Sequence, residues 1–297
     1  MRHIRRSPGR VCFDVFNIFL MLVIAFACIA PIWHVMMSSI SDPIILNASS
    51  GLVFRPLGDI TLRGYGLIFT ATSGIVVGYR NTVFYVITAV TFGTTLTIFA
   101  GYVLSRRYLY WRNFIMFFFS LTMLFNGGLI PFFMVVRGLG LINTPFAIIL
   151  PGTVSVFNIL IMRTAFAGLP ESLEESAKID GAGHLTIMFK IMVPLAKATI
   201  AVVVLFYSIG MWNSWFNASI FLTNRSLFPL QLFLREILIQ NDVASVTTAA
   251  EALEQVALYR SLVQYGTIVA ATMPVLFFYP FAQKYFVTGV MIGSIKG

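Results

Sequence analysis

Four charged side chains stand close together in one short stretch, EESAKIDGAG, at positions 174–183. It contains the carboxylates of Glu174, Glu175 and Asp180 and the amine of Lys178. Glu174 and Lys178 lie four positions apart, which is the spacing of a favourable ion pair on a helix. A catalytic site within apolar segments would need clustered Ser and His, His and Glu, or paired Asp, and these segments contain no such cluster. The stretch therefore indicates ion pairing and a turn rather than catalysis.

The composition shows in what kind of protein this stretch lies. The chain has 297 residues, of which 58% are hydrophobic and only 10% charged, whereas soluble domains carry about 25% charged residues. A mean hydropathy of +0.88 indicates a polytopic membrane protein. The net charge of +9 then reflects cytoplasmic Lys and Arg near span ends rather than nucleic-acid binding. Cys12, Cys28, His34 and His184 have no partners at metal-binding spacing, so no metal site is predicted.

Six apolar segments are long enough to cross a membrane, which needs about 20 residues. The first segment has no small-residue cleavage site after it and is interpreted as a retained helix rather than a signal peptide. The fourth and fifth segments are short and are expected to extend further. The predicted fold is therefore all-α, a polytopic membrane protein with spans at 15–37, 81–102, 114–136, 147–162, 199–215 and 265–285.

Positive charges predict the orientation of these spans. Lys and Arg concentrate before the first span, after the second and fourth, and around the last. This is the positive-inside pattern, with both termini and EESAKIDGAG cytoplasmic, in a multi-pass protein of the bacterial cell membrane. The residues that carry the pattern are Arg2, Arg5, Arg6, Arg10, Arg106, Arg107, Arg112, Arg163, Lys178, Lys190, Lys197, Lys284 and Lys296.

The chain is interpreted as a single transmembrane domain, 1–297, with a cytoplasmic insertion at 168–195 and an extracytoplasmic loop at 216–264. Residues 38–80 are interpreted as an irregular outer loop. Within the loop at 216–264, residues 229–239 are expected to form a short helix, and residues 247–259 are also helix-like. The face of the helix at 229–239 consists of Leu230, Phe233, Leu234 and Ile237.

Glycines mark special positions within the spans. Gly127 and Gly128, followed by Pro131, predict a kink or break in the third span. Gly93 and Gly101 in the second span are expected to allow close packing of helices.

The insertion at 168–195 predicts two short helices joined by a glycine turn. The first follows Pro170, has acidic residues in its first turn, and stops at Asp180-Gly181. The second presents an apolar face, formed by Leu185, Met188, Phe189 and Met192, and ends near Pro194. This face either packs on the ends of the chain's own spans or binds a partner.

Residues 171–195, ESLEESAKIDGAGHLTIMFKIMVPL, closely resemble the EAA motif of ABC-importer permease subunits. Glu175-Ser176-Ala177 matches with Ser at the second place, Asp180-Gly181-Ala182 matches fully, and Pro194-Leu195 matches. Ala198 stands where many members have a further Pro. The segments NGGLIPFF, LPGTVSVFNILIMR, PLQLFLREILI and KYFVTGVMIGSIKG are similar to the six-span carbohydrate permeases, within them the branch for oligosaccharide or polysaccharide uptake.

The resemblance implies that 171–195 includes a coupling helix, which sits in a cleft of a separate ATPase subunit. It assigns this coupling to Glu174, Glu175, Ala177, Asp180, Gly181, Ala182 and Pro194, with Glu175 offering its carboxylate to an ATPase arginine. Asp180 has the alternative role of capping the local turn. The chain has no glycine-rich phosphate loop, so Mg-ATP and its hydrolysis are expected in the partner, with no cofactor or catalysis in this chain. The other partners implied are a second homologous permease, a second ATPase subunit, an extracytoplasmic solute-binding protein and the sugar.

The expected substrate pathway uses polar and aromatic residues in or near the third to fifth spans, and hydrogen bonding between helices is the alternative explanation for them. An ion-driven secondary transporter is disfavoured because the cores of the spans contain essentially no ionisable residues. Amino-acid, phosphate and peptide importers carry the same motif, and they stay open as alternatives for the cargo. The pathway residues are Asn126, Asn158, Trp212, Asn213 and Trp215.

Overall fold

The computed structural model describes residues 8–70, 74–239 and 252–294, and in these ranges it is helical without strands. The prediction of an all-α protein is confirmed. The chain divides into two compact units, residues 1–73 with 237–270 and residues 74–236 with 271–297. The predicted division into a single transmembrane domain with two polar segments stays a prediction, and residues 240–251 of the predicted outer loop lie outside the described ranges.

The first unit contains α1 (Pro8–Ser38), α2 (Pro43–Ala48), α3 (Arg63–Ile68) and part of the long helix α15 (Ala252–Ser294). Residues 38–80, predicted as an irregular loop, therefore contain two short helices and the start of a third. Asp42 begins α2, because its side chain accepts hydrogen bonds from the backbone of Ile44 and Ile45. The Nδ1 atom of His34 accepts a hydrogen bond from the backbone of Val53 at 2.9 Å.

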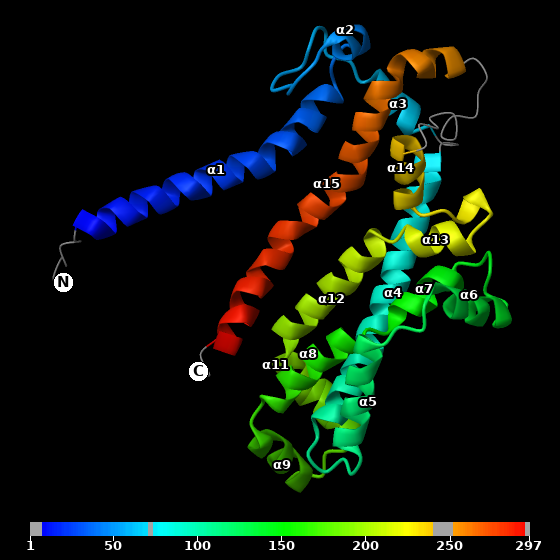
Figure 1. Cartoon of the computed structure of the whole chain (residues 1–297). Helices are drawn as coiled ribbons and strands as arrows, with labels where there is room; N and C mark the ends of the chain where they lie inside the picture. Colours follow the sequence, from blue (N-terminus) through cyan, green and yellow to red (C-terminus); the bar gives the residue numbers. More distant parts are fainter. Residues whose placement is uncertain (1–7, 71–73, 240–251, 295–297) are drawn as a thin grey trace. The chain divides into compact units, whose positions relative to one another are not determined.

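The second unit is built around α4 (Gly74–Ser105), which runs beside α8 (Val156–Ala167) and α12 (Lys197–Trp212) (Figure 1). A Cβ at Gly93 would lie 2.7 Å from the carbonyl oxygen of Thr153, and one at Gly101 would lie 2.7 Å from the Met162 side chain. Both distances are shorter than van der Waals contact. These glycines therefore permit the close helix packing that the sequence predicts.

The remaining helices of the second unit lie between these three in the sequence or follow α12. They are α5 (Arg112–Leu124), α6 (Leu129–Gly138), α7 (Phe146–Thr153), α9 (Glu171–Ile179), α10 (His184–Ile187), a π-helical turn (Met188–Met192), α11 (Val193–Leu195), α13 (Phe216–Phe221), a 3-10 turn (Arg225–Leu227), most of α14 (Leu230–Ile239) and the part of α15 from residue 271 on. In α14, Leu230, Phe233 and Ile237 are buried and Leu234 is half-buried, which confirms the predicted apolar face.

Three helical segments are long and apolar enough to cross a membrane alone: α1, α4 and residues 259–280 of α15. Three further pairs reach this length only together, and all three are bent: α5 with α6 by 113°, α7 with α8 by 40°, and the segment from α10 to α11 with α12 by 84°. Counting each pair as one span gives up to six, the number predicted.

The largest of these bends lies where the sequence predicts a break. Helix α5 ends at Leu124, and α6 begins after Gly128, whose φ of 84° is unfavourable for residues with a Cβ. Pro131 is in the first turn of α6, where a missing N–H costs no helical hydrogen bond. Residues 114–136 are therefore two helices joined at a sharp angle, which confirms the predicted break within this span.

Candidate functional site

The segment from α9 to α11 follows α8 directly and lies at one end of the second unit (Figure 1). Helix α9 begins after Pro170 and has Glu171 and Glu174 in its first turn and Lys178 in its last, which is the favourable order for the helix dipole. It ends at Ile179, as predicted. Gly181 follows with a φ of 78°.

The glycine turn after α9 has the hydrogen bonds of a Schellman motif. The N–H of Ala182 donates to the carbonyl of Ala177 at 2.9 Å, and the N–H of Gly181 donates to that of Lys178 at 3.0 Å. A Cβ at Gly181 would have nothing within 4 Å, so the positive φ, and not space, is what requires glycine here. Asp180 and Gly181 are exposed, and Ala182 is half-buried.

The two adjacent glutamates of α9 have different surroundings. The side chain of Glu174 is only 8% exposed. Its Oε2 pairs with Nη1 of Arg106, and its Oε1 lies 2.9 Å from Nζ of Lys178. The hydroxyl of Tyr108 donates to the same Oε1 at 3.5 Å. Glu175 is exposed, so it is the glutamate that a partner protein can reach.

Arg106, in the segment after α4, contacts three parts of the second unit. Its Nε donates to Oγ of Ser105 at 3.0 Å, and its Nη2 donates to the carbonyl of Phe166 at 3.4 Å. Its guanidinium also lies 4.9 Å from the centre of the Tyr102 ring. The ends of α4 and α8 and the first turn of α9 therefore meet at one buried guanidinium. We call Ser105, Arg106, Phe166 and Glu174 the Arg106 cluster.

The charges near α9 shift the pKa of its ionisable groups. Burial raises the pKa of the Glu174 carboxyl, but the hydrogen bond with Lys178 and the charge and hydrogen bond of Arg106 lower it more, so it lies below its ordinary value. The hydrogen bond with Glu174 raises the pKa of Lys178. Burial and the charge of Glu174 raise the pKa of Tyr108. At neutral pH, Glu174 is therefore an anion between two cations.

The helix after the glycine turn buries only part of the predicted apolar face. Ile187, Met188 and Met192 are buried against Tyr102 and Phe166, so the packing on the chain's own spans is confirmed for these residues. Leu185 and Phe189 of the same predicted face are 63% and 50% exposed, so for these two residues the binding of a partner stays the open alternative. Phe189 lies within the π-helical turn at Met188–Met192, which has more residues per turn than an α-helix and so changes the spacing of side chains around the helix axis.

The exposed surface of this segment combines polar and apolar residues. Ile179 is 87% exposed and follows Glu175 by four positions, so the two share one face of α9. Pro194 is exposed, and Ala177 is buried. We call Glu175, Ile179, Asp180, Gly181 and Leu185 the α9 surface. Sequence reasoning missed Ile179, although an isoleucine in an otherwise polar short helix was a usable signal.

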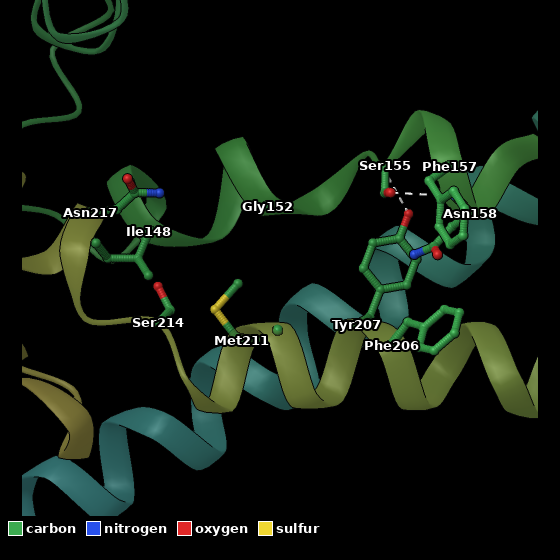
Figure 2. Close-up of a pocket in the computed structure, with 11 residues that line it drawn as sticks. Ile148, Gly152, Ser155, Phe157, Asn158, Phe206, Tyr207, Met211, Ser214 and Asn217 are labelled. Atoms are coloured by element: carbon green, nitrogen blue, oxygen red, sulfur yellow. Dashed lines mark hydrogen bonds between the residues drawn. The ribbon is translucent and has the colours of Figure 1, made fainter. Parts of the chain in front are cut away.

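A cavity of about 430 Å³ lies between α7, α8, α12 and α13 (Figure 2). Its polar lining comes from Ser155, Asn158, Tyr207, Ser214 and Asn217. Phe157 and Phe206 lie near Asn158 at one end, and Ser214 and Asn217 lie near Ile148 at the other. The Tyr207 hydroxyl hydrogen-bonds with the Thr97 hydroxyl at 2.8 Å and accepts from the Ser155 N–H at 3.1 Å, which fixes its position.

Of the five predicted pathway residues, Asn158 lines this cavity and the other four do not. Asn126 accepts a hydrogen bond from the Gly128 N–H at 2.9 Å in the turn between α5 and α6. Trp212 donates to the carbonyl of Ala271 at 3.2 Å. Asn213 is exposed just after α12, and Trp215 lies under the guanidinium of Arg235 at 4.8 Å. The four other polar lining residues were missed, since only the packing of the helices brings them together.

Comparison with known proteins gives consistent matches over most of the chain. Residues 93–292 match the family described as "Binding-protein-dependent transport system inner membrane component". The Bacillus subtilis (strain 168) protein named "Polygalacturonan/rhamnogalacturonan transport system permease protein YtcP" is 37% identical over 96% of this chain and 98% of its own length. "Protein LplC" of the same organism is 35% identical over 98% of this chain and 97% of its own length.

A solved structure resembles the fold at similar coverage. It is described as "Crystal structure of a bacterial ABC transporter involved in the import of the acidic polysaccharide alginate". It superposes with a TM-score of 0.86, at 30% sequence identity, over 95% of this chain and 99% of the other.

Proposed function

Because the chain belongs to the family of binding-protein-dependent transport system inner membrane components, we propose that it moves an oligosaccharide or polysaccharide fragment through the membrane as one permease subunit of an ATP-driven importer. It is an integral membrane permease with the type I ABC importer fold, and its homologues are permease subunits of carbohydrate importers. Such a permease works with an ATPase and a solute-binding protein. In our proposal the complete importer contains a second homologous permease and two ATPase subunits.

The carbohydrate cargo is supported by the relatives and by the cavity. One relative is named as a permease for polygalacturonan/rhamnogalacturonan transport and another as a permease for arabinooligosaccharide transport. The description of the solved structure names the import of alginate. The cavity combines hydroxyl and amide groups with the rings of Phe157, Phe206 and Tyr207, and sites for small molecules combine apolar walls with a few polar groups in this way. We assign the substrate pathway to this cavity, with Asn158 as the member that sequence and structure share.

The α9 surface is the part of the chain that we assign to ATPase docking. Mg-ATP binding and hydrolysis then take place in the partner, and the α9 surface faces the cytoplasm together with both termini. Glu175 presents an exposed carboxylate to an arginine of the ATPase, and Ile179 presents apolar area beside it. The Schellman turn at Gly181 allows close approach of the partner's backbone, because no side chain covers it.

The observation that carries this assignment is the separation of the two glutamates: Glu174 is paired internally, and Glu175 is left exposed on the same turn of α9. The test is a membrane pull-down of the tagged chain with its native neighbours. The wild type is expected to bring down an ATPase and a second permease, whereas Glu175→Arg and Gly181→Val lose the ATPase and keep the permease.

Glu171→Gln is the matched control for the pull-down. Glu171 is exposed on the same helix but already paired with Arg107 at 2.7 Å, so its variant is expected to keep the ATPase. If the wild type comes down alone, or if Glu175→Arg retains the ATPase, the docking assignment is wrong.

A further inference from the structure

The Arg106 cluster joins α9 to two spans through one side chain. The residues Ser105, Arg106 and Glu174 are all less than 8% exposed. The guanidinium donates to Glu174, to Oγ of Ser105 and to the carbonyl of Phe166. A planar guanidinium with several donors fixes the directions of its partners in a way that a single ammonium group does not. The cluster therefore sets where the first turn of α9 lies relative to the ends of α4 and α8.

We propose that Arg106 is a positioning residue for energy coupling: it makes α9, α4 and α8 move together when an ATPase displaces α9. This inference rests on the proposed function, because it presupposes that α9 is the helix that the ATPase contacts. The coupling motif itself does not contain Arg106, which is 68 residues away from Glu174 in the sequence.

The covalent connection alone would transmit such a displacement poorly. Helix α8 ends at Ala167 and α9 begins at Glu171, so three residues separate them. Of α9, only Glu174 and Ala177 are buried, and Ala177 has a single methyl group with which to pack. Without the ion pair, the first turn of α9 can pivot about the Gly168–Pro170 connection, because the large buried side chains that pack against Tyr102 of α4, namely Ile187, Met188 and Met192, lie beyond the turn at Gly181.

The chain provides a matched control one residue away. Arg107 Nε pairs with Glu171 Oε1 at 2.7 Å, so this pair joins the same two segments as Arg106 and Glu174. The side chains of Arg107 and Glu171 are 80% and 57% exposed. Exposed pairs of this kind contribute little, because water screens them and both side chains stay flexible. A functional role that depends on a fixed geometry is therefore expected at the buried pair and not at the exposed one.

The first experiment measures the position of α9 directly. Spin labels are placed at Val103→Cys and Ser176→Cys, both exposed positions on α4 and α9, after replacement of Cys12 and Cys28 by Ser. In the purified importer, the distance distribution is expected to be narrow for the wild type and for Arg107→Met, and broad for Arg106→Met. An unchanged distribution in Arg106→Met overturns the proposal.

The second experiment measures coupling in proteoliposomes with the complete importer, its binding protein and a labelled oligogalacturonide. Arg106→Met and Glu174→Gln are expected to assemble with the ATPase and to lower uptake per ATP hydrolysed by about tenfold, within the usual range of coupling effects. The double variant, Arg106→Met with Glu174→Gln, is expected to lower uptake per ATP hydrolysed no further than either single variant, because the two residues act as a unit. Arg107→Met and Glu171→Gln are expected to keep an uptake per ATP hydrolysed close to that of the wild type.

The outcomes separate a coupling role from a role in folding. If the variants only reduce the amount of assembled importer, and the residual importer keeps the wild-type uptake per ATP, the pair is a folding element and the proposal is overturned. Arg106→Lys keeps the charge but loses the planar fork, and it is expected to assemble fully with intermediate coupling. If the wild-type chain binds no ATPase, the proposed function fails, whereas the distance measurement in the chain still tests the anchoring of α9.

Discussion

Glu174 and Glu175 are adjacent in α9, but the first is buried against Arg106 and the second is exposed to solvent. Successive residues of an α-helix point about 100° apart, so one turn of helix presents one carboxylate inward and the next outward. The inward carboxylate contributes to the stability of the chain. The outward one is the group that we assign to recognition of the ATPase.

Substitution of Glu174 is therefore expected to affect the stability of the chain, and substitution of Glu175 its binding to the ATPase. Glu174→Gln leaves Arg106 buried without its anionic partner, and it is expected to lower the free energy of unfolding by roughly 1–3 kcal/mol. Glu175→Gln is expected to leave the thermal stability of the purified chain unchanged while weakening retention of the ATPase. Thermal unfolding in detergent and the pull-down distinguish the two. Equal loss of stability in both variants would contradict this prediction.

The buried ion pair also predicts a pH dependence. The pKa of Glu174 is lower in the folded chain than its ordinary value of 4.5. A carboxyl of this kind contributes stability above its ordinary pKa, and that contribution is lost as the pH falls through the lowered pKa. The difference in Tm between wild type and Glu174→Gln is therefore expected to be largest near neutral pH and to shrink below about pH 4.5. The exposed pair supplies the comparison, since Glu171→Gln is expected to show a small difference at every pH.

Gly181 is expected to tolerate substitution according to backbone conformation rather than size. Gly181→Ala places a Cβ at a φ of 78°, which costs roughly 1–2 kcal/mol for an L residue. Gly181→Asn is expected to cost less, because asparagine adopts the left-handed conformation more readily. Gly183→Ala is the control, since Gly183 has a φ of −74° and is also exposed. Chemical denaturation of the purified chain measures all three, and a destabilised Gly183→Ala would refute the conformational explanation.

The cavity predicts which asparagine matters for transport. Asn158→Leu preserves the approximate side-chain volume and removes the amide, and it is expected to reduce uptake of a labelled oligogalacturonide by about tenfold, the effect of one lost hydrogen bond. Assembly with the ATPase is expected to remain intact. Asn126→Ser keeps a side-chain acceptor in the turn between α5 and α6, and it should transport like the wild type. If Asn158→Leu takes up the labelled oligogalacturonide as well as the wild type does, the cavity is not part of the substrate pathway.

Features that depend on local sequence were predictable. The end of α9 follows from Asp180-Gly181, because the residue after a helix often needs a positive φ. The break between α5 and α6 follows from Gly127-Gly128 for a similar reason. The buried face of α14 follows from its spacing of apolar residues. Each of these is determined by residues within a few positions of one another.

Features that depend on packing between distant segments were not predictable from the sequence. By position in the sequence, Arg106 is one of several arginines of a loop that was predicted to be cytoplasmic, and nothing in its neighbourhood distinguishes it from Arg107. The polar cavity residues come from two separate segments, 155–158 and 207–217. The π-helical turn at Met188–Met192, which contains Phe189, was not predicted either, because an insertion into helical periodicity leaves no clear trace in the residue pattern.

The exposure of α1 has a consequence for how the chain responds to lipid composition. Its 31 residues extend about 46 Å at 1.5 Å per residue, more than the roughly 30 Å of a hydrocarbon layer. Only Ala30 and Ser38 of this helix are buried, so few contacts with its own chain determine its direction. A helix of this kind adjusts to bilayer thickness by tilting. Helix α4 is held by α8 and α12, so thinner or thicker bilayers are expected to change the tilt of α1 first.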